Sequence, residues 1–186
     1  MTVAGLVLAA GMGSRFGQPK ADLTVGGERL VDRAVALLIR GGCEPVVVVS
    51  GALRLTVARA IVVHNDAWAS GMASSLRRGL AAMPSDAAAA VVMLVDTPWL
   101  GVESVERVIS AHLAGATLAV ATYDGVRGHP VLLSREHWSA VAAAATGDVG
   151  ARAYLAGRPE VEEVDCTGTG DPADVDVPDS LHPPRR

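Results

Sequence analysis

Five continuous apolar runs recur along the first two thirds of the chain, and they restrict its fold more than any other feature of the sequence. The runs are AGLVLAAG (4–11), PVVVVSG (45–51), AIVVHN (60–65), AAVVMLVD (89–96) and ATLAVATY (116–123). They do not alternate with polar residues, and turn-forming residues border them. Such runs are typical of strands that are buried on both faces of a sheet.

Segments with helical periodicity lie between these runs. The stretch 30–39 places Val31, Val35 and Leu38 on one apolar stripe, and two glycines follow it closely. Similar patterns occupy 72–83, 102–114 and 135–145. Alternating buried strands and amphipathic helices predict an α/β fold, a single three-layer α/β/α domain around a mostly parallel, Rossmann-like sheet.

The length of 186 residues fits one domain with a substantial core. We expect that domain to span residues 1–181, with a short helix near Pro178, and residues 182–186 to form a disordered tail. Half of the residues are hydrophobic and 19% are charged, which is typical of a globular protein.

Charge and cysteine content exclude several classes of protein. The net charge of −4 gives no overall attraction to nucleic acid or to an anionic membrane. No apolar run approaches the roughly 20 residues that span a bilayer. Cys43 and Cys166 lack the spacing of a zinc site or a disulfide framework, so we expect a cytoplasmic protein.

A glycine-rich loop, LAAGMGSRFGQPK (8–20), follows the first predicted strand. It should therefore lie at the carboxyl edge of the sheet, where open α/β sheets bind ligands. Glycines allow backbone N–H groups to approach an anion closely, and Arg15 and Lys20 add positive charge. The loop is predicted to bind a polyphosphate, although an ordinary tight turn between strand and helix would have a similar glycine content.

Two well-known phosphate-binding motifs do not match this loop. A dinucleotide fingerprint needs G-x-G-x-x-G, but here the third glycine, Gly17, comes one residue late. A P-loop needs Gly-Lys-Ser/Thr, whereas Lys20 lies between Pro19 and Ala21.

The pattern LAAGxGxRxGxPK resembles the signature loop of the MobA-like nucleotidyltransferases, in particular the branch of molybdenum cofactor cytidylyltransferase. Four further blocks resemble that branch in the same order: HNDAWASGMASSLRRGL (64–80), RGHPVLLSREHW (127–138), GDVGARAYL (147–155) and ADVDVPDSL (173–181). The resemblance covers nearly the whole chain, and it implies the fold of nucleotide-diphospho-sugar transferases.

The resemblance implies that Arg15 and Lys20 bind the triphosphate of a nucleotide and that the loop backbone wraps around it. The implied nucleotide-binding residues are Leu8, Ala9, Ala10, Gly11, Gly13, Ser14, Arg15, Lys20 and Ser75. The Ala-Ala-Gly sequence of the loop favours CTP, because guanylyl-transferring relatives tend to have Ala-Gly-Gly.

Asp96 ends a predicted central strand, so its carboxylate should face the glycine loop across the edge of the sheet. Mg²⁺ prefers a few carboxylates together with phosphate oxygens and water. Asp96 is therefore a candidate metal ligand, with a turn or N-cap role as the alternative because Pro98 follows closely. The catalytic set is then Arg15, Lys20 and Asp96.

A second acidic group lies in ADVDVPDSL, where Asp174 and Asp176 are both candidate Mg²⁺ ligands. From the residues alone, an Asp-rich segment before a proline would be a turn. The resemblance to the family's DIDTPEDL block implies that this segment completes the metal site. Val177 replaces the threonine that is usual there.

The acceptor side of the site is predicted from two blocks. Gly71 precedes a helix whose first turn carries Ser74 and Ser75, with hydroxyl and N–H groups that can contact ligand oxygens. His129 lies between Gly128 and a proline, and the resemblance places it beside the acceptor. The predicted acceptor-binding residues are Gly71, Ser74 and His129.

The resemblance implies transfer of a nucleotidyl group, CMP from CTP, to a small phosphorylated acceptor such as molybdopterin, with a molybdoenzyme as a further partner. Two other functions stay open. Some proteins similar to this branch are NAD(P)H-dependent reductases of pigments such as nicotine blue, although the dinucleotide fingerprint is not met. The chain could instead be a non-catalytic accessory protein of a molybdoenzyme.

Overall fold

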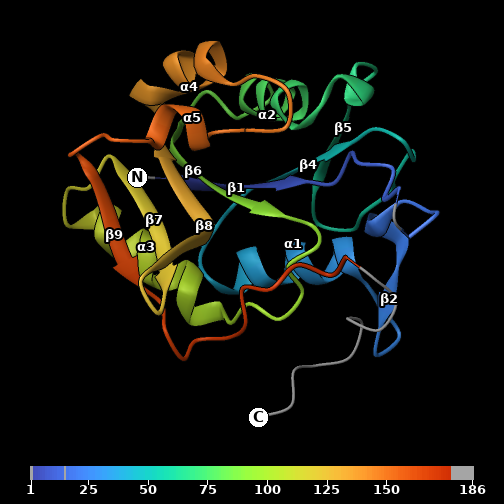
Figure 1. The fold of residues 1–186 in the computed structure, drawn as a ribbon, viewed down its shortest axis with the longest axis horizontal. Coiled ribbons are helices and arrows are strands. Elements are labelled where there is room, and N and C mark those ends of the chain that lie inside the picture. Colours follow the sequence, from blue (N-terminus) through green and yellow to red (C-terminus); the bar gives the residue numbers. More distant parts are fainter. Residues whose placement is uncertain (1, 15, 177–186) are drawn as a thin grey trace.

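The computed structural model describes residues 2–14 and 16–176, which form a large twisted sheet with helices on both faces (Figure 1). The strands are β1 (Thr2–Leu8), β2 (Thr24–Val25), β3 (Glu28–Arg29), β4 (Val46–Ser50), β5 (Ile61–His64), β6 (Ala87–Leu94), β7 (Leu118–Tyr123), β8 (Val126–Ser134) and β9 (Val161–Asp165). The α-helices are α1 (Leu30–Arg40), α2 (Met72–Ala81), α3 (Val102–Leu113), α4 (Trp138–Ala144) and α5 (Arg152–Leu155). Short 3-10 helices are η1 (Lys20–Asp22), η2 (Trp68–Ser70) and η3 (Arg135–His137).

The large sheet has the strand order β5-β4-β1-β6-β8-β7-β9. Strand β8 runs antiparallel to both of its neighbours, and every other neighbouring pair in this sheet is parallel. The prediction of a mostly parallel sheet is therefore confirmed. Strands β2 and β3 form a separate antiparallel pair between η1 and α1.

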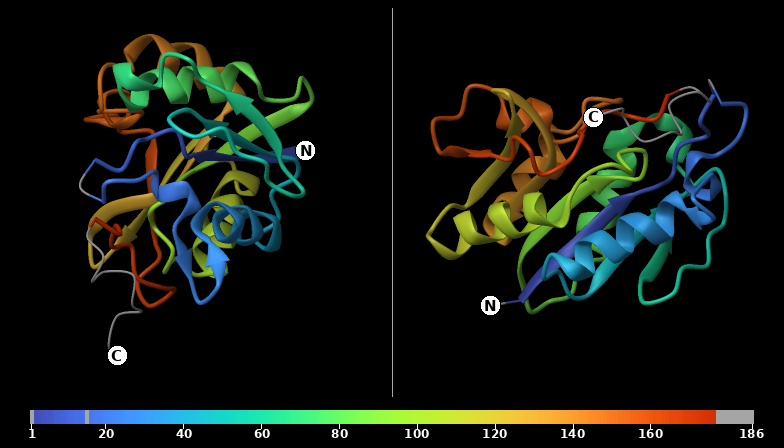
Figure 2. Two further views of the ribbon diagram at one scale, coloured as in Figure 1. Left: turned by 90° about the vertical axis from the view of Figure 1, so that its right-hand side faces the viewer. Right: turned by 90° about the horizontal axis from the view of Figure 1, so that it is seen from below.

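Helices cover the two faces of the sheet in different groups (Figure 2). Helices α1 and α3 pack on one face through side chains such as Leu38 and Val105. Helices α2, α4 and α5 pack on the other face through side chains such as Leu76, Trp138 and Leu155. The predicted three-layer α/β/α arrangement is confirmed, and both cores consist mainly of Val, Leu and Ala.

All five apolar runs lie in strands, and the predicted helices at 72–83, 102–114 and 135–145 correspond to α2, α3 and η3 with α4. Arg15, the helix expected near Pro178, the domain end at residue 181 and the tail 182–186 lie outside the described residues. In the part of the chain that the structure describes, no helix is long and apolar enough to cross a membrane.

Candidate active site

The pairing of β1 with β6 brings the glycine loop and Asp96 to one edge of the sheet. The two strands are parallel, and Leu8 is the register partner of Leu94. The glycine loop begins directly after Leu8, and Asp96 follows Leu94 by two residues. Val95 N donates a hydrogen bond to Leu8 O at 3.2 Å, which extends the ladder beyond the strand ends.

A tight turn shapes the glycine loop around Gly13. Its carbonyl oxygen accepts hydrogen bonds from Phe16 N at 2.8 Å and Gly17 N at 3.0 Å. The φ of Gly13 is +62°, and a Cβ at this position would collide with the carbonyl oxygen of Gln18. Both the backbone conformation and the close approach of the chain therefore require glycine here.

Lys20 lies between two carboxylates at the end of this loop. Its Nζ is 2.8 Å from Asp96 Oδ2 and 2.7 Å from Asp176 Oδ1. Burial alone would lower the pKa of the Lys20 ammonium, but the hydrogen bonds and charges of Asp176 and Asp96 together raise the pKa above its ordinary value. The lysine therefore stays protonated and positively charged at neutral pH.

A backbone hydrogen bond holds the second acidic segment, residues 174–176, beside Asp96. Val175 is fully buried, and its N–H donates to Asp96 O at 2.8 Å. Asp174 and Asp176 flank it, and Asp176 is the one that contacts Lys20. Burial raises the pKa of the Asp174 carboxyl, and the negative charges of Asp96 and Asp176 raise it further.

Carboxylate oxygens suit Mg²⁺, a hard cation that keeps several waters and binds substrate phosphates. Within residues 2–14 and 16–176, no three His, Cys, Asp or Glu side chains converge into a ready-made metal site. Asp96 and Asp176 are held close together by Lys20 and could both reach one ion. The donor set fits a cation whose remaining ligands come from phosphate oxygens and water.

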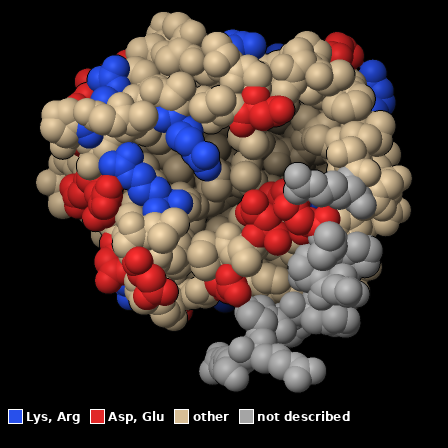
Figure 3. Space-filling model, viewed as in Figure 1, with Lys and Arg blue, Asp and Glu red and all other residues tan. Residues whose placement is uncertain are grey.

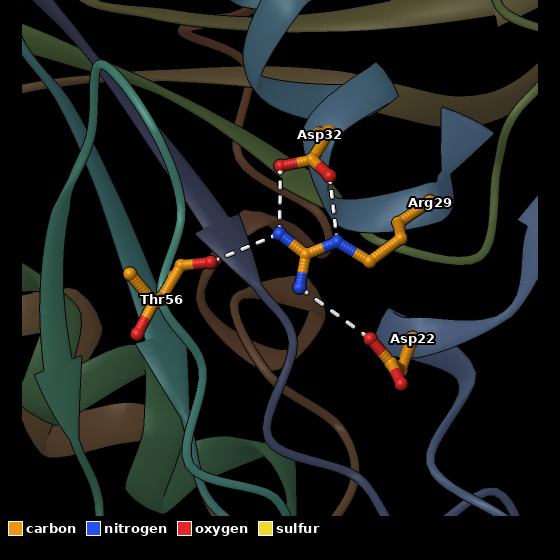
Figure 4. Close-up of polar contacts among 4 residues, drawn as sticks. All are labelled: Asp22, Arg29, Asp32 and Thr56. Carbon is orange, nitrogen blue, oxygen red and sulfur yellow. Dashed lines mark hydrogen bonds and ion pairs between the residues drawn. The ribbon is translucent and has the colours of Figure 1, made fainter.

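Arg29 ties the segment that carries Lys20 to its surroundings (Figure 4). Its guanidinium donates to Asp32 at 2.6 and 3.0 Å and to Thr56 O at 2.9 Å, and it lies 3.4 Å from Asp22. Asp22 belongs to η1, the same short helix as Lys20. The Arg29 contacts thus link η1, the start of α1 and the segment after β4.

A cavity of about 520 Å³ lies between the glycine loop, the start of α2 and the carboxylates. The predicted site residues that line it are Leu8, Ala10, Gly11, Gly13, Ser14, Lys20, Gly71, Ser75, Asp96 and Asp176. Ala9, also predicted to bind the nucleotide, lies instead in the core between the sheet and helices α1 and α3. Its N–H donates to Val49 O. The volume is within the range of small-molecule sites.

Ser74 is held in a buried hydrogen-bond network at the first turn of α2. Its hydroxyl lies 2.9 Å from both Ala67 O and Gly71 O, and Asn65 Nδ2 donates to it at 2.9 Å. Asn65 Nδ2 also donates to Ser75 Oγ at 3.0 Å. Ser74 does not line the cavity, so its role in the described structure is to fix the start of α2.

Asp148 is a site residue that the sequence analysis did not single out, although it lies in the block GDVGARAYL. Its Oδ1 accepts a hydrogen bond from Met72 N at 3.1 Å, and Gly147 O accepts one from Ala73 N at 2.8 Å. A Cβ on Gly71 would come within 2.6 Å of Gly147 O, so glycine at that position permits the contact. The segment 147–150 therefore packs on the N-terminus of α2.

A second cavity, of about 590 Å³, adjoins the first. Leu8, Met72, Leu94 and Asp148 line both cavities. His129, together with Gly128, lines the second cavity, and burial lowers the pKa of its imidazole. Figure 3 shows that this face is hollowed, with Lys and Arg side chains gathered on the left of the hollow and Asp and Glu at its lower right.

Comparisons with known proteins agree with this architecture. Residues 5–164 match the model of the MobA-like NTP transferase domain. A nicotine blue oxidoreductase of Paenarthrobacter nicotinovorans is 38% identical, covering 97% of this chain and 95% of that protein. A probable molybdenum cofactor guanylyltransferase of Opitutus terrae is 36% identical, covering 53% and 52%.

Solved structures show the same fold. Rv0371c from Mycobacterium tuberculosis H37Rv superposes with a TM-score of 0.84 at 27% identity, covering 96% of this chain and 95% of that one. The same protein in complex with manganese has a TM-score of 0.76 at 26% identity over the same shares. A UDP-glucose pyrophosphorylase with UDP-glucose shares the fold alone, with a TM-score of 0.75 at 13% identity, covering 97% and 96%.

Proposed function

Because the chain belongs to the family of MobA-like NTP transferase domains, we propose that it transfers a nucleotidyl group from a nucleoside triphosphate to a small phosphorylated acceptor and releases pyrophosphate. CTP is the favoured nucleotide and molybdopterin the favoured acceptor. The observation that carries the proposal is the meeting of the glycine loop, Lys20, Asp96 and Asp176 around one cavity.

The phosphate chain is proposed to lie along the glycine loop. Backbone N–H groups of Gly11 to Ser14 would bind phosphate oxygens, and Arg15 would add a second cation. Lys20 would turn its ammonium from the carboxylates toward the bridging oxygen that leaves with pyrophosphate. The lysine then stabilises the negative charge that develops on that oxygen in the transition state.

Asp96 is proposed to hold Mg²⁺, with Asp174 or Asp176 as a further ligand. The bound ion would supply charge neutralisation at the phosphate oxygens. Structural similarity to a protein that forms a manganese complex supports the use of a divalent cation. Oxygen ligands alone favour a hard cation at this position.

The acceptor is proposed to enter from the second cavity, past Gly71, the start of α2 and His129. An oxygen of its phosphate attacks the α-phosphorus, a new P–O bond forms, and the bond to pyrophosphate breaks with its electron pair leaving on the pyrophosphate. A phosphate monoester is already anionic at neutral pH, so this attack needs no general base. Alignment of the two substrates would provide most of the rate.

Thermal-shift measurements against the four nucleoside triphosphates with Mg²⁺ test the proposal. Stabilisation follows ligand affinity, so CTP is expected to raise Tm more than ATP, GTP or UTP. Failure of every triphosphate to bind in the presence of Mg²⁺ would contradict nucleotidyl transfer. A larger Tm shift with GTP than with CTP would replace CTP as the proposed nucleotide and leave the proposal of nucleotidyl transfer unchanged.

A second candidate function is an NAD(P)H-dependent reductase of a pigment-like substrate. It is favoured by 38% identity to a nicotine blue oxidoreductase over nearly the whole of both chains. Binding of NADH or NADPH without any triphosphate affinity would support it. A partnership with a molybdoenzyme and a cytoplasmic location stay predictions of the sequence.

A further inference from the structure

The cavity lined by His129 is lined mainly by aliphatic side chains, which restricts the class of ligand that it can hold. Side chains from the sheet, Leu8, Val92, Leu94, Val120 and Val131, line it together with Met72, Leu76 and Leu155 from the helices that cover this face. A pleated sheet presents a broad, nearly flat floor. A volume of about 590 Å³ is ample for a molecule of one to three fused rings.

The aliphatic side chains disfavour a sugar in the inner part of this cavity, because the charged residues that also line it, Arg127, Asp148 and Arg152, are exposed to solvent. Each buried sugar hydroxyl needs a hydrogen-bond partner, and an unpaired one loses the interaction that it had with water. A flat, mostly apolar ring loses little on leaving water and gains contacts with the sheet. The thioether of Met72 also favours contact with an aromatic ring.

His129 places a hydrogen-bond acceptor beside the aliphatic side chains of this cavity. Its Nδ1 lies 3.2 Å from Val92 O, and a carbonyl oxygen can only accept, so Nδ1 carries the hydrogen. Burial keeps the ring neutral by lowering its pKa. In the neutral ring the other nitrogen, Nε2, must then be an unprotonated acceptor.

Nε2 of His129 is left open to a ligand. The structure gives this atom no hydrogen bond to any residue of 2–14 or 16–176. Among the described residues, His112 Nε2 is the side-chain nitrogen or oxygen atom that is fully buried and has no hydrogen-bond partner. His129 Nε2 also has no partner among them but is not in this class, so it must be at least partly accessible. Tyr123 OH donates to His129 O at 2.9 Å and steadies the backbone that carries the ring.

We propose that this cavity binds a planar, mostly apolar ring molecule that donates one O–H or N–H hydrogen bond to Nε2 of His129, and that His129 selects the ligand by this bond. Identifying the ring molecule as the nucleotidyl acceptor rests on the proposed function. The hydrogen bond itself requires neither nucleotide nor metal.

Two coumarins of the same shape test the proposal. At pH 6.5, 7-hydroxycoumarin carries the O–H donor, and 7-methoxycoumarin has a methyl group in its place. Fluorescence anisotropy with the full chain is expected to show about tenfold tighter binding of the hydroxy compound, the size of one hydrogen bond in an apolar site. Equal affinities, or binding of neither compound, would overturn the proposal.

Two variants locate the preference at Nε2. His129→Asn keeps an amide donor for Val92 O but has no atom at the position of Nε2, so the tenfold preference should disappear. His129→Gln places its amide group near Nε2 and should restore part of it. If the asparagine variant retains the preference, as judged on samples with a cooperative melting transition, the bond is not made by His129.

A spectroscopic measurement examines the tautomer without any ligand. Two-bond ¹H–¹⁵N correlation spectra of histidine-labelled protein are expected to show a neutral His129 ring with Nδ1 protonated. A ring protonated at Nε2, or a charged imidazolium at neutral pH, would overturn the proposal. These measurements use no triphosphate, so failure of triphosphate binding would remove the proposed function and leave the outcome of this test intact.

Discussion

Nζ of Lys20 lies 2.8 Å from Oδ2 of Asp96, although the two residues are 76 positions apart in the chain. The contact follows from the parallel pairing of β1 with β6, because both residues belong to segments that leave the same edge of the sheet. Asp176, 156 positions from Lys20, joins them from the C-terminal segment. One half-buried cation thus holds together three distant parts of the sequence.

Asp96→Asn is expected to reduce nucleotidyl transfer by about 100-fold or more, since it removes the charge proposed to hold the metal. The amide has nearly the same shape, so the fold should persist. Initial rates of pyrophosphate release with CTP, Mg²⁺ and molybdopterin as the acceptor, together with a melting curve, measure both effects.

Asp86→Asn is a matched control for that experiment. Asp86 is exposed and precedes β6, whereas Asp96 follows the same strand at its other end. The control is expected to keep full activity. Wild-type rates in Asp96→Asn would remove the metal assignment.

The five apolar runs predicted five strands of the large sheet, and β8 and β9 were missed. The prediction of burial on both faces was wrong for β5, an edge strand that is half-buried and in which Ile61 is exposed. In β8, the first half (Val126 to His129) is exposed or half-buried, so it does not read as a continuous apolar run. In β9 at the sheet edge, Glu162 and Glu163 are exposed. Local patterns do not reveal a strand whose apolar partners lie elsewhere in the chain.

The same limit applies to the site. Lys20 and Asp96 could be brought together from the sequence, because each follows or ends a predicted parallel strand. Asp148 could not, since its role depends on the packing of its segment against the start of α2. The structure also shows that Asp176 contacts Lys20, a contact that the sequence analysis did not predict. Which of Asp174 and Asp176 binds the metal stays a prediction.

Gly71→Ala is expected to separate the segment 147–150 from α2. The new Cβ would lie 2.6 Å from the carbonyl carbon and oxygen of Gly147, and the φ of +105° already strains any residue other than glycine. We expect the free energy of unfolding to fall by about 3 kcal/mol, measured by urea denaturation.

Gly115→Ala separates the clash from the backbone strain. Gly115 has a similar φ of +116°, but a Cβ there meets no atom within 4 Å. Its loss should be about 1 kcal/mol, from strain alone. Equal losses in the two variants would show that the contact with Gly147 is unimportant.

Asp148→Ala is expected to remove the hydrogen bond to Met72 N and lower the free energy of unfolding by about 1 kcal/mol, as for the loss of a helix cap. Asp148→Asn keeps an oxygen acceptor and should be close to wild type in stability. Because Asp148 lines both cavities, the alanine variant should also raise the KM for the acceptor. A stability loss as large in the asparagine variant would contradict the capping role.

Cys43 provides a test of stability against pH. Burial raises the pKa of its thiol from 9.0 to about 12, so the folded state holds the proton more tightly than the unfolded state does. This contribution is fully present below pH 9 and is lost as the pH rises from 9 toward 12. Relative to Cys43→Ala, the wild type should lose about 1 kcal/mol of unfolding free energy between pH 8 and pH 10, measured by urea denaturation under reducing conditions. Parallel curves for the two proteins across this range would mean that the thiol ionises as easily in the folded protein as in the unfolded chain.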